Sequence, residues 1–321
     1  MISFIHTRGH GFELREIKKS SQSPAVKLMD YDALFKKSRL PFSTYVFTDM
    51  ERLGFWDLEL AGHLFMQLKN AGLKVLNNPA RAKNRFTLLK TFHAAGLNDF
   101  NVHRAEELPA SIRFPVFLRK MQGHALPLSG LLNTRTELEQ SIEAAIATGI
   151  PATNQIVVEY AGEPVREGLY RKLATFRIGE KIIPYLCGHD TDWYVKAGKK
   201  GIAGEELYRE ERDIIQTNPH AEHLRKVFDL AEIEFGRADY GFYNGRIQIF
   251  EINTNPLLKK FSPHPSPLRR ESMRVTWKNI TTTLREIDSS DGVTLRLKKD
   301  KMYRYQKWSL GNLFSRSRKV D

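Results

Sequence analysis

The strongest constraint on the fold is a short acidic segment around residue 240. It contains Arg237-Ala238-Asp239-Tyr240-Gly241 and, across an Asn244-Gly245 turn, Glu251-Ile252-Asn253-Thr254-Asn255-Pro256. Apolar residues alternate with these polar ones, which predicts two strands buried on both faces. Ionised groups in such strands are costly unless a partner compensates them, and a bound cation is a suitable partner. The segment therefore predicts a hairpin that holds a metal ion beside phosphate.

Strand parity decides which of these side chains can meet. Residues two apart in a strand share a face, so Glu251 and Asn253 point the same way. A two-residue turn at Asn244-Gly245 would pair Asp239 with Phe250 and turn the Asp239 carboxylate to the opposite face. A site that includes all three oxygen donors therefore requires a different loop.

We predict a three-residue loop, Tyr243-Asn244-Gly245, with Gly245 in the left-handed conformation of a bulge. This loop places Arg237 opposite Glu251 and brings the arginine, the two carboxylates and the carboxamide to one face. Oxygen ligands of this kind suit Mg²⁺ or Mn²⁺, and Mg²⁺ usually completes its shell with water and substrate phosphates. The alternative is a surface hairpin stabilised by ion pairs.

The composition indicates an ordinary globular protein. Of the 321 residues, 41% are hydrophobic and 27% are charged, and no segment is apolar and long enough to span a bilayer. The start of the chain is too short for a signal-peptide core and resembles a first strand, so we expect a cytoplasmic protein. Cys187 is the only cysteine, which excludes an internal disulfide and a cysteine-rich metal site.

The net charge of +13 raises the question of anionic partners. Much of the excess lies near the end of the chain, in a run that is typical of a solvated tail or a peripheral docking segment. The run comprises Arg296, Lys298, Lys299, Lys301, Arg304, Lys307, Arg316, Arg318 and Lys319. No nucleic-acid motif accompanies it, so we expect an anionic small-molecule or peptide substrate rather than nucleic acid.

Hydrophobic periodicity divides the chain into three parts. Residues 1–77 read as a small α/β lobe with a parallel sheet, and a helix opened by Asn78-Pro79 follows it. Residues 78–265 read as a larger domain, within which residues 112–160 form a separate lobe of strand, loop, helix and strand. Residues 266–321 read as one amphipathic helix followed by the basic segment.

This order of parts resembles the ATP-grasp superfamily, over roughly residues 40 to 260. Its members include D-alanine:D-alanine ligase, glutathione synthetase and ribosomal-protein glutamate ligases. The resemblance implies an α+β fold in which two lobes clasp ATP, preceded by the small α/β lobe, with residues 112–160 as the lid. It also implies that Asp239, Glu251 and Asn253 bind one or two Mg²⁺ ions and that Arg237 is the catalytic arginine.

The resemblance assigns further positions to the nucleotide. Arg85 and Arg119 stand where relatives carry phosphate-binding lysines, and arginine keeps the charge. The segment Glu159-Tyr160-Ala161 stands where relatives read the adenine edge, mostly through the backbone, and Glu159 could also accept from the amino group. Lys172 is expected to face the triphosphate or the substrate. The loop Met121 to Gly130 matches the family's phosphate cover in position, but it has fewer glycines than relatives have.

The function that the resemblance implies is an ATP- and Mg²⁺-dependent ligase. It would join a carboxylate to an amine or a thiol through an acyl phosphate, with Trp193 and Lys196 lining the acceptor site. One alternative is a kinase of the same fold, for which Asp190 or Asp192 would be the base. A second alternative is a nucleotide-binding protein that has lost catalysis. The sequence leaves open the identity of both substrates and whether the chain forms a homo-oligomer.

Overall fold

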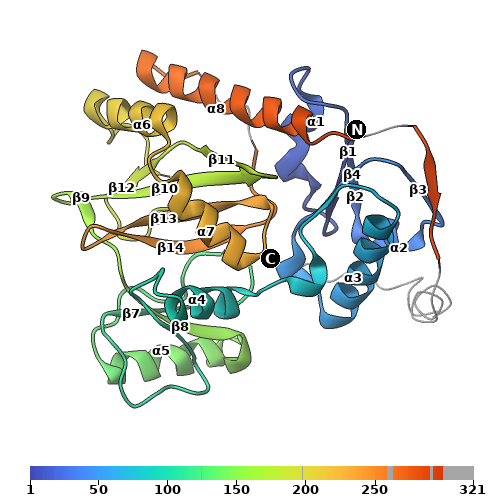
Figure 1. Ribbon diagram of the computed structural model, residues 1–321. Helices are drawn as coiled ribbons and strands as arrows, with labels where there is room; N and C mark the ends of the chain where they lie inside the picture. The colour runs from blue at the N-terminus through green and yellow to red at the C-terminus, as the bar shows by residue number, and fades with distance from the viewer. Residues whose placement is uncertain (124, 197, 259–262, 290–291, 299–321) are drawn as a thin grey trace.

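The N-terminal part of the computed structural model is built on a parallel sheet (Figure 1). The model describes residues 1–123, 125–196, 198–258, 263–289 and 292–298. The sheet has the strand order β2-β1-β4-β5, and neighbouring strands are parallel. Its strands are β1 (Ile2–His6), β2 (Val26–Asp30), β4 (Thr44–Phe47) and β5 (Val75–Leu76). The predicted parallel sheet in this part of the chain is therefore confirmed.

Helices cover both faces of this sheet. Apolar residues of α2 (Tyr31–Lys36) and α3 (Phe55–Asn70) pack against one face. Leu14 and Ile17, which belong to η1 (Gly11–Leu14) and α1 (Arg15–Lys19), lie in a second cluster with residues of the central sheet and of the last helix. The second cluster joins the N-terminal part to the rest of the molecule.

The central sheet carries the acidic hairpin. Its path is β11-β10-β13-β14, all antiparallel, and two short strands, β9 and β12, also pair with β10. The strands are β9 (Pro164–Arg166), β10 (Leu169–Ile178), β11 (Lys181–Pro184), β12 (Gly188–Asp190), β13 (Phe235–Tyr243) and β14 (Arg246–Asn253). The long strand β10 therefore lies next to the hairpin along much of its length.

A smaller sheet forms the lobe that the sequence predicts as a lid. Its order is β6-β8-β7, with strands β6 (Val102–Arg104), β7 (Val116–Lys120) and β8 (Gln155–Glu159). One face packs against α5 (Arg135–Ala147), and the Thr134 side chain caps that helix. The other face belongs to the same apolar cluster as α4 and the central sheet. The pocket described below lies between these two sheets.

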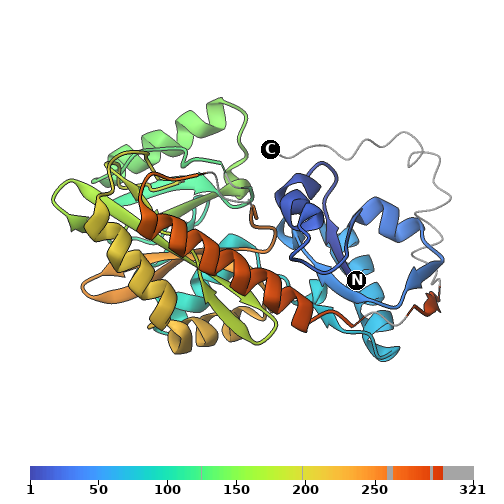
Figure 2. The same cartoon turned by 90° about the horizontal axis from the view of Figure 1, so that it is seen from above.

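The remaining helices surround the central sheet. They are α4 (Arg85–Ala94), α6 (Glu205–Thr217), α7 (Ala221–Ala231) and α8 (Pro267–Glu286). Viewed from above, α8 runs beside α6 across the central sheet towards the N-terminal part (Figure 2). The chain then returns to the N-terminal part, where β15 (Thr294–Arg296) pairs with β3 (Arg39–Pro41). The start of the basic segment is thus docked, and residues 299–321 lie outside the described residues.

Three expectations about elements are corrected. Asn78-Pro79 opens only the short 3-10 helix η3 (Pro79–Arg81), and α4 begins at Arg85 with Asn84 as its cap. Helix α6 is present where the sequence predicts no element. The hairpin loop has two residues, as described below. No helix in the described ranges is long and apolar enough to cross a membrane.

Candidate active site

The acidic hairpin reaches the predicted arrangement of side chains by a different route. Tyr243 pairs with Arg246, so the loop contains only Asn244 and Gly245, both with positive φ (50° and 71°). The predicted three-residue loop is therefore wrong. An Asn-Gly pair favours the two-residue turn because both positions tolerate a left-handed backbone.

A bulge inside the hairpin returns Glu251 to the same face of the sheet as Asp239. Asp239 pairs with Glu251 whereas Tyr240 pairs with Ile249, which leaves Phe250 as the extra residue. A side chain at Gly241 would meet the Phe250 ring, since a Cβ built there lies 2.9 Å from it. Glycine therefore gives the bulged aromatic ring room to pack over the strand.

The polar side chains of the hairpin consequently share one face. Asp239 lies directly opposite Glu251, and Arg237 lies opposite Asn253 rather than opposite Glu251 as predicted. The Oδ1 of Asn253 accepts from the Asn255 amide at 2.8 Å. In the described part of the chain, no three histidine, cysteine, aspartate or glutamate side chains gather into a metal cluster. The candidate metal ligands are therefore two carboxylates and one carboxamide.

Asp239 is buried and is held by two cations. Its carboxylate accepts from Arg237 through both oxygens, at 2.7 and 3.1 Å, and its side chain is only 2% exposed. The Lys172 ammonium lies 3.0 Å from Oδ2 and also donates to the Lys196 carbonyl at 2.7 Å. Burial lowers the pKa of Arg237, but the ion pair with Asp239 outweighs it and raises the pKa overall. The ion-pair partner of Arg237 is thus Asp239 on its own strand, not Glu251, which the sequence predicts opposite it.

Glu251 is held by the two arginines that stand at the lysine positions. Arg85 Nη2 donates to Oε2 at 3.1 Å, and Arg119 Nη2 lies 3.7 Å from the same oxygen. The pKa of Arg85 is lowered, first by burial and then by the charge of Arg119. The structure therefore brings four predicted cations together around two predicted carboxylates: Arg85, Arg119, Lys172 and Arg237 around Asp239 and Glu251.

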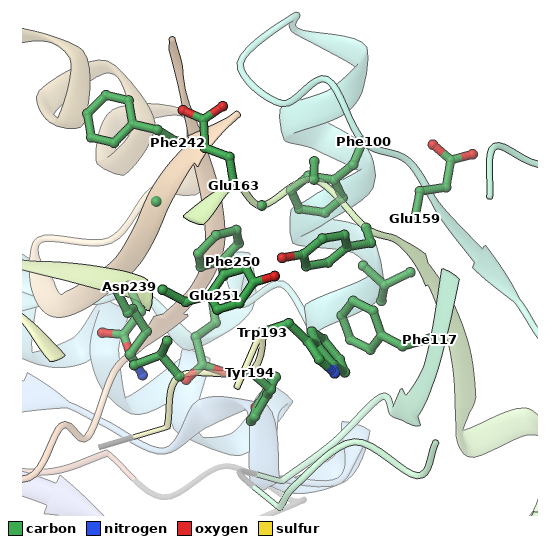
Figure 3. A pocket seen from close by; sticks show the side chains of 18 of the residues that line it. Phe100, Phe117, Glu159, Glu163, Trp193, Tyr194, Asp239, Phe242, Phe250 and Glu251 are labelled. Atoms are coloured by element: carbon green, nitrogen blue, oxygen red, sulfur yellow. The ribbon is translucent and has the colours of Figure 1, made fainter. Parts of the chain in front are cut away.

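An aromatic pocket opens beside these charges. Asp239 and Glu251 lie on one side of it, and Phe100 and Phe117 lie on the other (Figure 3). The Trp193 ring packs against Phe117 with centroids 5.0 Å apart. The aromatic residues that line the pocket are Phe100, Phe117, Tyr160, Tyr170, Trp193, Tyr194, Phe242 and Phe250.

Sequence reasoning missed most of this aromatic wall. Phe117 could have been found, because it is two positions before Arg119 on one strand and thus shares its face. Trp193, which the resemblance assigns to an acceptor site, lines this pocket and packs against Tyr160, with ring centroids 5.5 Å apart. The sequence does not indicate that Phe250 lines the pocket, because the direction of its side chain depends on the bulge.

The segment after β8 contributes its backbone to the pocket, but the Glu159 carboxylate points away from it (Figure 3). This carboxylate accepts from the amides of Asn101 at 2.9 Å and Arg113 at 3.2 Å, and His103 Nε2 lies 3.2 Å from it. The expectation that Glu159 accepts from an adenine amino group is therefore corrected. The backbone of Tyr160 and Ala161 still lines the pocket.

The lining of the aromatic pocket and the charges beside it suit a ligand with a planar ring at one end and negative charge at the other. Aromatic faces suit a nucleobase. The four cations and two carboxylates together carry a net charge of +2, which suits phosphate oxygens. The Tyr160 hydroxyl is buried without a hydrogen-bond partner among the described residues, and burial raises its pKa, so it stays protonated and can donate. Two carboxylates and a carboxamide are oxygen donors of the kind that Mg²⁺ binds.

Comparison with known proteins identifies the fold. No family model matches the chain, and no curated protein sequence matches it. Among solved structures, the D-alanine–D-alanine ligase from Coxiella burnetii matches with a TM-score of 0.52 and 13% identity, over 89% of this chain and 94% of that chain. The VanG D-Ala:D-Ser ligase from Enterococcus faecalis matches with a TM-score of 0.51 and 13% identity, over 89% of this chain and 98% of that chain. The chain therefore has the ATP-grasp fold that its sequence predicts.

Proposed function

We propose that the protein is an ATP- and Mg²⁺-dependent ligase that joins a carboxylate to an amine or a thiol. The observation that carries the proposal is the placement of two carboxylates, each held by two cations, at one side of an aromatic pocket. The matching solved structures, whose names describe ligases, support a reaction of this class. The small-molecule or peptide substrate that we expect is anionic.

The residues around the pocket suggest how ATP would bind. The adenine ring lies among the aromatic side chains, and the backbone of Tyr160 and Ala161 contacts its edge. Arg119 and Lys172 turn from the carboxylates to the phosphates, because phosphate oxygens offer them an equivalent charged partner. Asp239 then keeps Arg237 and Glu251 keeps Arg85, and each carboxylate has a lone pair left that would bind Mg²⁺.

The reaction then needs positioning and charge stabilisation rather than a protein nucleophile. A substrate carboxylate oxygen attacks the γ phosphorus, the bond to ADP breaks, and an acyl phosphate forms. The amine attacks the acyl carbon, loses a proton, and inorganic phosphate leaves. Mg²⁺ bound by Asp239, Glu251 and Asn253 supplies charge neutralisation at the phosphates. Arg237, already fixed beside Asp239, stabilises negative charge in the transition states without reorganising.

The kinase alternative lacks a specific observation in its favour. Asp190 accepts from the Thr191 amide at 2.8 Å, and Asp192 accepts from the Tyr194 amide at 3.0 Å. Neither carboxylate is among the described residues that line the pocket. Both aspartates thus support a loop rather than a reacting hydroxyl.

Incubation with ATP, Mg²⁺, candidate acids and hydroxylamine tests the proposal. We expect a hydroxamate and one ADP for each hydroxamate formed. Phosphorylation of a hydroxyl without hydroxamate would identify a kinase instead. ATP binding without either product would favour the nucleotide-binding protein that has lost catalysis, and the absence of ATP binding by calorimetry would exclude both the ligase and the kinase.

Glu251→Gln tests the metal assignment within the same assay. We expect it to abolish turnover while the circular dichroism spectrum stays unchanged. Glu139→Gln is the matched control, because Glu139 pairs with Arg135 on the exposed surface of α5. Unchanged turnover in Glu251→Gln would refute the metal assignment.

A further inference from the structure

Arg85 contacts the main chain of the lid more than it contacts the site. Its guanidinium Nη1 donates to the carbonyl oxygens of Lys120 at 2.9 Å and Met121 at 3.3 Å. Nη2 donates to the Gly123 carbonyl at 2.8 Å and to Glu251 at 3.1 Å. The side chain is 8% exposed, so these bonds form in a largely dry environment. Three of its four acceptors are therefore backbone groups of one short segment.

That segment is where strand β7 ends and the loop begins that the sequence predicts as a phosphate cover. The Met121 amide donates to the Asn154 carbonyl at 2.8 Å, and the Leu128 amide donates to the Leu118 carbonyl at 2.7 Å. Arg85 itself belongs to the first turn of α4, outside the lid sheet. One guanidinium thus joins α4, the start of the lid loop and the hairpin strand that carries Glu251.

This arrangement depends on arginine rather than on positive charge alone. The planar guanidinium presents its donors in a fixed fork, which lets two nitrogen atoms reach four oxygen atoms at once. A lysine ammonium is a single point with three donors on a flexible chain, and it cannot span the same set of carbonyls. Both terminal nitrogen atoms of Arg85 are engaged by carbonyls, and Nε, which is buried without a partner among the described residues, is its one donor left for phosphate.

We propose that Arg85 is a positioning residue that fixes the start of the lid loop relative to Glu251, rather than a phosphate-binding residue. The part that concerns Glu251 as a metal ligand rests on the proposed function. The part that concerns the lid loop does not rest on the proposed function, because Arg85 contacts the loop in the protein without nucleotide. The sequence-based assignment of Arg85 to phosphate is replaced by this role.

Hydrogen exchange of the nucleotide-free protein tests the lid part. In Arg85→Lys we expect the amides of Met121 and Leu128 to exchange at least about tenfold faster, since a tenfold change corresponds to the loss of roughly one charge-assisted hydrogen bond. Arg81→Lys is the matched control, because Arg81 pairs with Glu232 on the surface and is 62% exposed. We expect exchange within about twofold of the wild type there.

A set of reference amides and a second variant complete this experiment. The amides of β1 lie in the N-terminal sheet and should keep their protection, which separates local loosening from global unfolding. Arg85→Gln provides a second variant that lacks the charge, and it should loosen the same two amides. Unchanged exchange of both amides in both variants would overturn the proposal.

Turnover and nucleotide affinity distinguish a positioning residue from a phosphate-binding one. For Arg85→Lys we expect kcat to fall about tenfold or more while the Kd for ATP changes less than about threefold, as for a residue that acts mainly on the transition state. A large loss of ATP affinity with normal exchange of the loop amides would assign Arg85 to phosphate instead. If the wild type binds no ATP, the proposed function fails, and the exchange experiment still decides the lid part.

Discussion

Replacement of Glu159 by glutamine tests how the segment beside the pocket is held. The Glu159 side chain is 9% exposed and receives two backbone amides besides its contact with His103. Burial alone would raise its pKa, but the hydrogen bonds from His103, Asn101 and Arg113 outweigh burial and lower the pKa to about 2 from 4.5. The ionised carboxylate is therefore favoured by the folded state.

The expected magnitude follows from this shift. A folded pKa below the unfolded pKa contributes stability that is fully present well above pH 4.5 and is lost as the pH falls towards 2. The difference corresponds to about 3 kcal/mol near neutral pH, of which roughly 1 kcal/mol is already lost at pH 4. Glutamine keeps one acceptor oxygen, so we expect Glu159→Gln to cost about 2 kcal/mol at pH 7 and about 1 kcal/mol at pH 4.

Urea unfolding of both proteins at the two pH values, followed by circular dichroism, measures these differences. Glu139→Gln, on the surface of the lid helix, is the control and should cost less than about 0.5 kcal/mol at either pH. ATP affinity of Glu159→Gln should stay within about threefold of wild type, because the carboxylate points away from the pocket. A penalty that is equal at both pH values, or a large loss of ATP affinity with unchanged stability, would refute the reasoning.

Two further perturbations test other features of the site, and a third tests Asp49, a buried residue after β4 that accepts from Thr7 and Asn255. Deletion of Phe250 removes the extra residue and leaves Asp239 opposite Glu251 in a regular ladder, so calorimetry should still detect a Mg²⁺-dependent increase in ATP affinity; loss of that increase in a folded variant would contradict the register. Trp193→Ala should weaken ATP binding about tenfold, the typical worth of one aromatic stacking partner, and an unchanged Kd would place the base elsewhere. Burial raises the pKa of Asp49 to about 6, so ionisation opposes folding. The stability of the wild type relative to Asp49→Asn should therefore fall between pH 4 and 6 in urea unfolding, and a rise over that window would contradict the sign.

Regular patterns allowed much of the fold to be predicted from the sequence. The parallel N-terminal sheet, the capped helix α5 and the two strands of the hairpin each have a local signal in periodicity, caps or turn residues. Helix α6 has few apolar residues, and Leu207 and Ile215 are the apolar ones that it buries. A largely charged helix resembles a solvated loop in sequence, which explains why it was missed.

The register of the hairpin shows where local reasoning stops. The parity argument was sound in requiring one extra residue, but it placed that residue in the loop. Asn244-Gly245 is itself a favourable two-residue turn, and the extra residue fits at Phe250 because Gly241 leaves room for its ring. A bulge in mid-strand depends on a contact between facing strands, and the sequence of either strand alone does not indicate it.

The charges of the site show a related limit. Sequence reasoning found all four cations and both carboxylates, but it could not pair them, because pairing depends on which strand faces which. The pairs have a functional consequence: each carboxylate already lies beside two cations, so a metal ion that bound without phosphate would be repelled by them. In the proposed function, phosphate oxygens would become the partners of Arg119 and Lys172 when Mg²⁺ binds Asp239 and Glu251. The ion pairs that satisfy these buried charges without ligand would then favour binding of the metal and the nucleotide together rather than of either alone.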